Sequence, residues 1–407
     1  METRLLTEHW EQENRTSLSG YREHGGYDGW NKAFTMERSV LRQEIESSNL
    51  RERDWTSRCL REQWSTLPAE RSTTYLVADG YEAEPGVFKD RTLLRRDPHA
   101  VLEGIAIAAR AVSARQAFLV VRKAFVEERA GLQKALDELN ASGLLGENPV
   151  VNIHLCVVGE GLVPGEPSSL VSALEGKKGW PRLSPPLLTE QGLWEQPTVV
   201  HNVETLATLP WILRKGGVAY TGFGTSRSSG TRLISVSGPV RNPGVFEVEM
   251  GISFKRFLRE DVGWMKEGRR LLGVLPGGLS SPPLGIDEIE RVLLCFESIE
   301  NFGSSLGSAG LIVLPYDSSA LEVLESMTQF YQHSSCGQCS PCREGTYWLA
   351  QLSQKLREGD GGSYDFKMLQ EVCQSMQGQG ICPLPSRAAR TTTNFLRVFS
   401  QDFQDYV

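Results

Sequence analysis

The stretch SCGQCSPCREGT, residues 335–346, places Cys336, Cys339 and Cys342 with two residues between neighbours. This spacing lets successive thiolates converge on one centre. It matches the start of a ferredoxin-type iron–sulfur motif, whose fourth cysteine comes from elsewhere. Zinc sites more often use two C-x2-C pairs set well apart. We therefore expect a [4Fe–4S] cluster, with a zinc ion or a set of unrelated buried thiols as the alternatives.

A fourth ligand has two candidates after the motif, Cys373 and Cys382. Cys382 lies in GQGICPLP, residues 378–385, where the neighbouring Gly and Pro residues predict a turn. Eight cysteines in a chain of this size do not suggest a disulfide framework, and clustered cysteines in a reducing compartment more often bind metal. The isolated cysteines are interpreted as buried thiols: Cys59, Cys156, Cys295 and Cys373.

At 407 residues the chain is too long for one ordinary core, so two or three domains are expected. The formal net charge is −7 without a Lys/Arg-dense run, which argues against a nucleic-acid partner and against binding to anionic membranes. The first residues are charged and lack the apolar core of a signal peptide, and no apolar stretch is long enough to cross a bilayer. We expect a cytoplasmic or organelle-matrix protein without direct membrane insertion.

Alternating apolar strands and helices in the first half of the chain predict parallel βαβ units. Ligands of such a sheet bind beyond the carboxyl ends of its strands. Polar residues 1–70 predict irregular helices, and the Pro/Gly-rich stretch 161–188 predicts an irregular segment that is functional or interfacial. The predicted strands are 75–80, 117–122 and 150–158, and the predicted helices are 98–114 and 124–139.

The second half of the chain has a different character. Residues 231–248 contain two β-rich runs around a turn with Asn242, Pro243 and Gly244, which predict a hairpin. We place a small α+β domain at about 230–315, and we expect a helical bundle over 317–400.

Six segments, in the same order, resemble the NADH-binding flavoprotein subunit of complex I, whose relatives occur in NAD-reducing hydrogenases and NAD-dependent formate dehydrogenases. The 39 residues from 343 to 381, between Cys342 and Cys382, are close to the family spacing. The resemblance therefore implies Cys336, Cys339, Cys342 and Cys382, and not Cys373, as ligands of one [4Fe–4S] cluster. The segments are HGGYDGWNKAF (24–34), YLVADGYEAEPGVFKDR (75–91), LEGKKGWPRLSPP (174–186), GLWEQPTVVHNVETLA (192–207), SVSGPVRNPGVFEVEMG (235–251), and SCGQCSPCREGT followed by ICPLPSRAA.

The resemblance implies an α/β Rossmann-like flavin-type domain over 1–229, a β-grasp (α+β) domain over 230–315, and a C-terminal helical bundle carrying the iron–sulfur cluster over 316–407. It also implies that NADH gives a hydride to FMN and that electrons leave singly through the cluster. The positions that match the FMN and NAD site of the family are Glu82, Glu84, Gly165, Glu166 and Asn202.

The largest difference between this chain and the family sequence lies in the loop on which the nucleotide site of the family depends. The family reads LRGRGGAGFPTGLKWSF where this chain reads LRERDWTSRCLREQWST, residues 50–66. Glycine lets backbone N–H groups approach a ring or a phosphate, whereas Trp55 fills space and Glu52 and Asp54 repel a phosphate. His201 replaces a family asparagine, and we interpret it as a hydrogen-bonded residue that fills a vacated pocket.

Other family positions change as well. Gln63 replaces a lysine, Asp79 an asparagine, Tyr81 an aspartate, Leu162 a tyrosine and Pro167 a glutamate.

Three functions compete. The first is an iron–sulfur electron-transfer subunit of a multi-subunit oxidoreductase of the NADH-dehydrogenase type, without functional FMN or NADH binding of its own. The second is an FMN-dependent NADH dehydrogenase subunit with a remodelled pocket, and the third is a non-redox scaffold with a structural zinc site. We favour the first, because the changes affect the loop that must touch the ligand while all four cluster cysteines remain. Its partners are then other redox subunits, including a neighbouring iron–sulfur or flavin subunit, through which it associates with a membrane.

Overall fold

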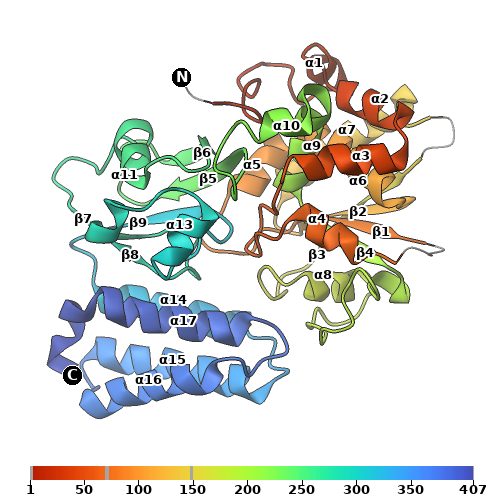
Figure 1. The fold of residues 1–407 in the computed structure, drawn as a ribbon. Helices are drawn as coiled ribbons and strands as arrows, with labels where there is room; N and C mark the ends of the chain where they lie inside the picture. Colours follow the sequence, from red (N-terminus) through yellow and green to blue (C-terminus); the bar gives the residue numbers. More distant parts are fainter. Residues whose placement is uncertain (1–2, 69–72, 147–149, 407) are drawn as a thin grey trace.

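The computed structural model describes residues 3–68, 73–146 and 150–406. Figure 1 shows a parallel sheet surrounded by helices, then a second sheet, and finally a group of helices near the C-terminus. The prediction of a mixed α/β fold with a parallel, Rossmann-like sheet is confirmed. The division at residues 229 and 315 stays a prediction.

The first sheet has four parallel strands in the order β3-β2-β1-β4. Three of them fall where strands were predicted, whereas β4 lies in a segment for which none was predicted. Because all four strands run in the same direction, the loops that follow them meet at one edge of the sheet. The strands are β1 (Tyr75–Gly80), β2 (Gln116–Arg122), β3 (Asn152–Val158) and β4 (Thr198–Asn202).

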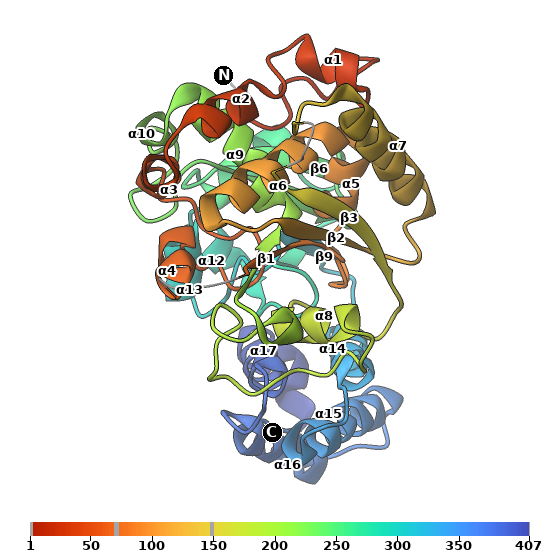
Figure 2. The ribbon, with the colours of Figure 1, turned by 90° about the vertical axis from the view of Figure 1, so that its right-hand side faces the viewer.

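Helices cover both faces of this sheet. α6 (Pro98–Val112) and α9 (Val203–Lys215) pack on one face, and α8 (Pro167–Leu174) lies on the other (Figures 1 and 2). Nearly all of α6 is buried, which explains why most of its residues are apolar. The prediction of an irregular segment over 161–188 is wrong at α8, where Pro167 occupies the first turn and Glu166 caps the helix. The other helices of this part are α5 (Lys89–Arg96), α7 (Val126–Ser142) and α10 (Gly217–Tyr220), with the 3-10 turn η1 (Leu193–Glu195).

Short helices form the polar N-terminal stretch, as predicted, although residues 1–2 and 69–70 of that prediction lie outside the described residues. The buried carboxylate of Glu103 on α6 holds two of them. It accepts hydrogen bonds from the Tyr21 hydroxyl at 2.5 Å and from the backbone N–H groups of Tyr27 and Trp30 at 2.8 and 2.9 Å. The helices are α1 (Leu18–Arg22), α2 (Asp28–Thr35), α3 (Arg38–Ser47) and α4 (Leu60–Ser65).

The second sheet has the strand order β6-β5-β9-β7-β8. β5 and β6 form the predicted antiparallel hairpin, and β5 also pairs in parallel with β9. The assignment of this part as a β-grasp domain stays a prediction. Its strands are β5 (Thr231–Ser237), β6 (Gly244–Glu249), β7 (Leu271–Leu275), β8 (Leu284–Gly285) and β9 (Gly310–Pro315), and its helical segments are α11 (Phe254–Arg256), η2 (Phe257–Asp261), α12 (Ile286–Ile289) and α13 (Phe296–Asn301).

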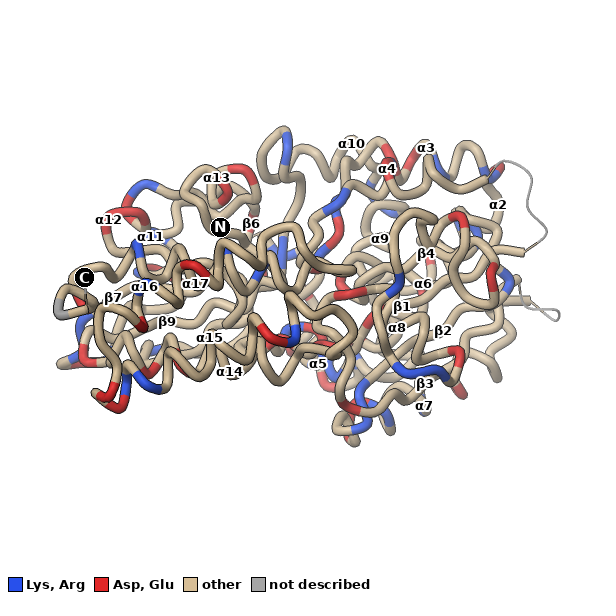
Figure 3. Tube along the Cα trace, turned by 90° about the horizontal axis from the view of Figure 1, so that it is seen from below, with Lys and Arg blue, Asp and Glu red and all other residues tan. Residues whose placement is uncertain are grey.

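The stretch after β9 folds into helices that share an apolar core. Figure 3 shows that acidic and basic residues are interspersed along the chain trace. In the part of the chain that the structure describes, none of the helices is both long and apolar enough to cross a bilayer. The helices are α14 (Ala320–Ser334), α15 (Ser340–Glu358), α16 (Ser363–Met376) and α17 (Leu384–Val398), followed by η3 (Ser400–Tyr406).

Candidate functional site

The four cysteines predicted to bind a cluster lie together where α14 ends and where α15 and α17 begin. Cys342 is buried in the first turn of α15, and the other three are half-buried. The thiols of Cys336 and Cys339 interact with that of Cys342, and Cys336 and Cys342 interact with Cys382. No disulfide joins them, because all are free cysteines. The fold therefore brings residues 336, 339, 342 and 382 into one group.

The donor set fits an iron–sulfur cluster. Four free thiols lie near one another, and the N-terminus of α15, where Cys339 is the cap residue, favours negative charge. Burial raises the pKa of Cys342 to about 11 and that of Cys382 to about 12, so binding of a cluster must release both protons. Across residues 3–68, 73–146 and 150–406, no group of three or more His, Cys, Asp or Glu is arranged to hold a single metal ion. A cluster does not need such a group, because its iron and sulfide atoms stand between the thiolates.

Cys373 does not join this group. It is buried within α16, and its thiol interacts with the side chains of Thr392 and Thr393 on α17. This placement agrees with its interpretation as a buried thiol. The assignment of the other four cysteines as cluster ligands stays a prediction.

The five residues predicted to bind FMN and NAD lie at the ends of strands of the first sheet or at the starts of helices that pack on it. Glu82 and Glu84 follow β1, Gly165 and Glu166 precede α8, and Asn202 ends β4 and caps α9. The parallel sheet places the ends of β1 and β4 side by side. The contacts of these five residues decide what the edge can hold.

Glu82 and Asn202 are both bound by groups on or beside α5. Glu82 accepts a hydrogen bond from the Asp90 backbone N–H at 2.7 Å, and burial, with the Asp90 carboxyl next, raises the pKa of Glu82 to about 8. The Asn202 amide donates to the Asp90 carboxylate at 3.0 Å and accepts from Lys89 Nζ at 3.3 Å. Lys89 also pairs with Glu204 at 2.8 Å. These polar groups are therefore satisfied within the protein.

Glu84 and Glu166 also have protein partners. Glu84 accepts from the Ser280 backbone N–H at 2.7 Å and from its hydroxyl at 2.8 Å, and Arg387 of α17 reaches it at 3.4 Å. Burial raises the pKa of Glu84. Glu166 accepts from the Ser168 N–H at 3.1 Å and from the Ser168 hydroxyl at 2.5 Å, as the cap of α8.

The side chain of Glu52 occupies the start of α9. Its carboxylate accepts from the Thr205 hydroxyl at 2.9 Å, from the Asn202 N–H at 3.3 Å and from His201 Nδ1. His201 is fully buried, and its Nε2 accepts from Trp64 Nε1 at 3.0 Å. The interpretation of His201 as a hydrogen-bonded residue is confirmed. A helix N-terminus that follows a parallel strand is a natural anion site. Here the Asn202 side chain caps α9 by accepting from the Glu204 N–H, and the Glu52 carboxylate lies beside this cap.

Trp55 covers the turn at Gly165. Its indole N–H donates to the Gly165 carbonyl, and the ring leaves no room for a Cβ at Gly165, whose φ of +68° itself favours glycine. On the other side, Arg387 Cζ lies 4.9 Å from the centre of the ring, and its guanidinium donates to the Pro164 carbonyl at 3.3 Å. Trp55 therefore lies between the turn before α8 and the first turns of α17.

The loop around Asp54 is held by its own side chains. Asp54 Oδ1 accepts from the Thr56 N–H at 2.7 Å, from the Thr56 hydroxyl at 2.6 Å and from the Ser57 N–H at 3.2 Å. The Glu52 N–H donates to the Arg58 carbonyl at 2.7 Å and closes the loop. Burial, with the charge of Glu52 next, raises the pKa of Asp54 to about 6. The loop is thus ordered without the glycines of the family sequence.

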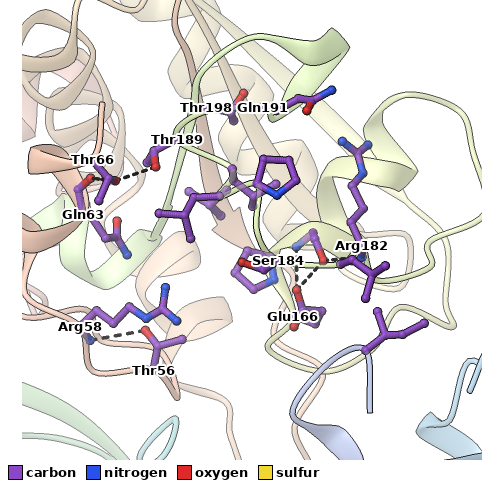
Figure 4. Close-up of a pocket in the computed structure, with 18 of the residues that line it drawn as sticks. Thr56, Arg58, Gln63, Thr66, Glu166, Arg182, Ser184, Thr189, Gln191 and Thr198 are labelled. Carbon is purple, nitrogen blue, oxygen red and sulfur yellow. Dashed lines mark hydrogen bonds between the residues drawn. The ribbon is translucent and has the colours of Figure 1, made fainter. Parts of the chain in front are cut away.

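A cavity of about 950 Å³ opens beside this loop. Figure 4 shows polar side chains on its wall, and the hydroxyls of Thr66 and Thr189 are hydrogen-bonded at 2.6 Å. Ile381 and Pro383, the neighbours of Cys382, also line it. We call the edge of the parallel sheet where FMN and NAD were predicted to bind the nucleotide-type edge. The cavity therefore extends from this edge to the segment around Cys382, the fourth predicted cluster ligand.

Two residues that shape this edge were not singled out from the sequence. Lys89 lies within a segment that matches the family, so it could have been found. Arg387 lies 303 positions from Glu84, and no local pattern signals a contact over that distance.

Comparison with known families and proteins agrees with this arrangement. The Nuo51 FMN-binding domain matches residues 45–211, and the NADH-ubiquinone oxidoreductase-F iron-sulfur binding region matches residues 322–406. The second match contains all four clustered cysteines.

Whole-chain relatives point the same way. An F-type subunit of the NADH-quinone oxidoreductase of Rhizobium meliloti is 36% identical over 95% of this chain and 91% of its own length. The mitochondrial 51 kDa subunit of NADH-ubiquinone oxidoreductase of Neurospora crassa is 36% identical over 89% of this chain and 76% of its own length. A chain of the NAD+-reducing [NiFe]-hydrogenase in the H2-reduced state superposes with a TM-score of 0.88 at 26% identity, over all of this chain and 67% of that one. The chain therefore belongs to the family of the F-type, 51 kDa subunit of complex I, which includes the corresponding subunit of NAD-reducing hydrogenases.

Proposed function

We propose that this chain is an iron–sulfur electron-transfer subunit that binds neither FMN nor NADH at its own nucleotide-type edge. The observation that carries the proposal is the position of Glu52. Its buried carboxylate lies beside Asn202, the cap residue of α9, and it would have to be displaced before a phosphate could bind there. A phosphate beside this carboxylate would also meet a repulsive charge.

Trp55 supports the same conclusion. A flat cofactor needs the backbone at Gly165 to be open, but the indole ring and Arg387 already cover it. Four of the five positions matched to the family site already have hydrogen-bond partners within the protein. The residues present do not fit a flavin nucleotide.

The residues of the helical part do fit a cluster. A bound [4Fe–4S] cluster supplies one-electron transfer. Cys336, Cys339, Cys342 and Cys382 would hold it, and the apolar core around Cys342 keeps water away from that side. The N-terminus of α15 offsets part of the negative charge of the thiolates.

The proposal requires partners. Electrons would enter from a neighbouring iron–sulfur or flavin subunit, because this chain would not take them from NADH itself. The relatives are named as subunits of larger oxidoreductases, which supports this placement. A cytoplasmic or matrix location, with membrane association through partner subunits, belongs to the same proposal.

The competing function is an FMN-dependent NADH dehydrogenase subunit with a remodelled pocket. The cavity of about 950 Å³ and the match of residues 45–211 to an FMN-binding domain favour it. A change in the loop 50–66 would have to open the edge before a flavin could enter.

Anaerobic purification separates these functions. Expected are about four iron atoms per chain, broad iron–sulfur absorption, only traces of flavin after acid extraction, and reduction of the cluster by dithionite but not by NADH. One FMN per chain together with a cluster that NADH reduces would overturn the proposal. A colourless protein with one zinc ion would instead support the scaffold.

A further inference from the structure

Ser335 lies directly before the first cysteine of the motif, at the end of α14. Its hydroxyl oxygen is 3.4 Å from the sulfur of Cys342, which is seven positions further along the chain. The backbone N–H of Gly337 donates to the same oxygen at 3.4 Å. The hydroxyl is thus held between the loop of the motif and the most buried of the four thiols.

Binding of iron to Cys342 would fix the direction of the hydrogen bond between this residue and Ser335. A hydroxyl carries one proton and two lone pairs, and a backbone N–H can only donate. The Ser335 oxygen therefore accepts from Gly337, and its proton remains available for Cys342. A cysteine bound to iron has no proton, so its sulfur can only accept.

The loop holds this geometry from both sides. Gly337 has a φ of +75°, a conformation that other residues adopt at a cost, and this conformation accompanies the N–H contact with Ser335. Arg343 donates to the Gly337 carbonyl at 3.1 Å and pairs with Glu344 at 2.8 Å. The loop therefore keeps the hydroxyl near the sulfur.

We propose that Ser335 is a positioning residue that raises the reduction potential of the cluster by donating a hydrogen bond to the sulfur of Cys342. The inference rests on the proposed iron–sulfur function. Reduction adds negative charge that is shared with the thiolates, and a donor at sulfur stabilises the reduced form more than the oxidised form. Because Cys342 is only 3% exposed, water cannot replace this donor.

A redox titration followed by electron paramagnetic resonance tests the inference on the full chain with its cluster. Ser335→Ala is expected to make the midpoint potential more negative. At a fixed potential, the ratio of reduced to oxidised cluster should fall about threefold, which is about 28 mV for a one-electron couple. Ser335→Thr keeps a hydroxyl and should restore the wild-type midpoint.

Ser334→Ala is the matched control. Ser334 is the last residue of α14, and within the described residues its side chain makes no hydrogen bond, so its replacement should leave the midpoint unchanged. A second readout is the coupling of an exchangeable proton to the reduced cluster. This coupling should be present in the wild type and in Ser334→Ala and lost in Ser335→Ala.

Each outcome decides a separate question. A fully loaded Ser335→Ala cluster with the wild-type midpoint and the same proton coupling would overturn the inference and leave the iron–sulfur function intact. If Ser335→Ala does not load iron, the Thr variant decides, because a wild-type midpoint supports the role of the hydroxyl and a shifted one contradicts it. A wild-type protein without iron would overturn the proposed function and the inference together.

Discussion

The helical part and the parallel-sheet part of this molecule hold their polar side chains in different ways. In the helical part, four cysteines lie close together as free thiols. At the edge of the parallel sheet, Glu52 binds His201, Thr205 and the start of α9, and Trp55 covers Gly165. A ligand site keeps donor atoms available, whereas a site that has lost its ligand pairs them with each other. This contrast is the basis of the proposal that the thiol group binds a cluster and that the nucleotide-type edge binds no nucleotide.

Removal of one thiol gives the largest expected effect. Cys339→Ser should abolish the cluster and loosen the helical part, because three thiolates and a hydroxyl hold iron poorly. Iron and sulfide content and the spectrum of the reduced protein measure the loss. Cys373→Ala is the control and should keep its iron, since this thiol lies apart from the group. Unchanged iron in Cys339→Ser would count against the ligand assignment.

Opening the sheet edge should change the affinity of the chain for FMN. The double variant Glu52→Gly, Trp55→Gly frees the start of α9 and uncovers Gly165. It should bind FMN at least about tenfold more tightly than the wild type, which corresponds to about 1.4 kcal/mol. Quenching of flavin fluorescence measures the affinity, and Glu13→Gly, an exposed position that does not line the cavity, is the control. If the wild type and the double variant bound FMN equally well, Glu52 and Trp55 would not be the residues that exclude FMN from the sheet edge.

The internal carboxylate should also stabilise the fold. Glu52→Ala leaves His201, Thr205 and the Asn202 N–H without their acceptor in a buried place, which should cost about 2–4 kcal/mol of unfolding free energy. Urea unfolding measures the change. Glu62→Ala should stay within about 0.5 kcal/mol of the wild type. A Glu52→Ala variant as stable as that control would show that the carboxylate contributes nothing to folding.

A smaller effect is expected from pH. Burial raises the pKa of Asp79 to about 7 from its ordinary value of 3.8, so the folded chain holds this proton more tightly than the unfolded chain. The associated stability is complete below about pH 4 and is lost as the pH rises to about 7. Between pH 6 and pH 8 the wild type should lose about 1 kcal/mol more than Asp79→Asn.

Unfolding free energies at the two pH values test this prediction, with Glu62→Gln as the control that should keep the wild-type dependence. Parallel pH profiles for the wild type and Asp79→Asn would exclude Asp79 as the titrating group.

Local patterns in the sequence predicted much of the fold. The bounds of β1 match those of the predicted strand at 75–80, because a short apolar run before a turn allows few alternatives. α8 was missed because its Pro and Ser residues resemble a loop, although Pro at a first helical turn is a start signal. β4 was missed because a run of five residues is too short for a periodic signal.

The candidate site was predictable in its parts and not in its contacts. Spacing and family resemblance pointed to Cys382 over Cys373. Cys382 interacts with Cys336 and Cys342 and Cys373 lies apart, while the ligand assignment itself stays a prediction. The replaced glycines predicted a changed loop. The sequence could not show that Glu52 would reach Thr205, 153 positions away, or that Arg387 would lie against Trp55. Such contacts depend on how distant elements pack, which local patterns do not encode.

The carboxylate of Glu52 has a consequence for how the chain matures. A protein that needs a nucleotide to complete its core gains stability only as that nucleotide becomes abundant. Here the occupant of the helix start is part of the polypeptide, so it is present at every stage of synthesis. Folding of this half of the molecule should therefore be independent of the flavin supply of the cell, and only the cluster would remain to be delivered.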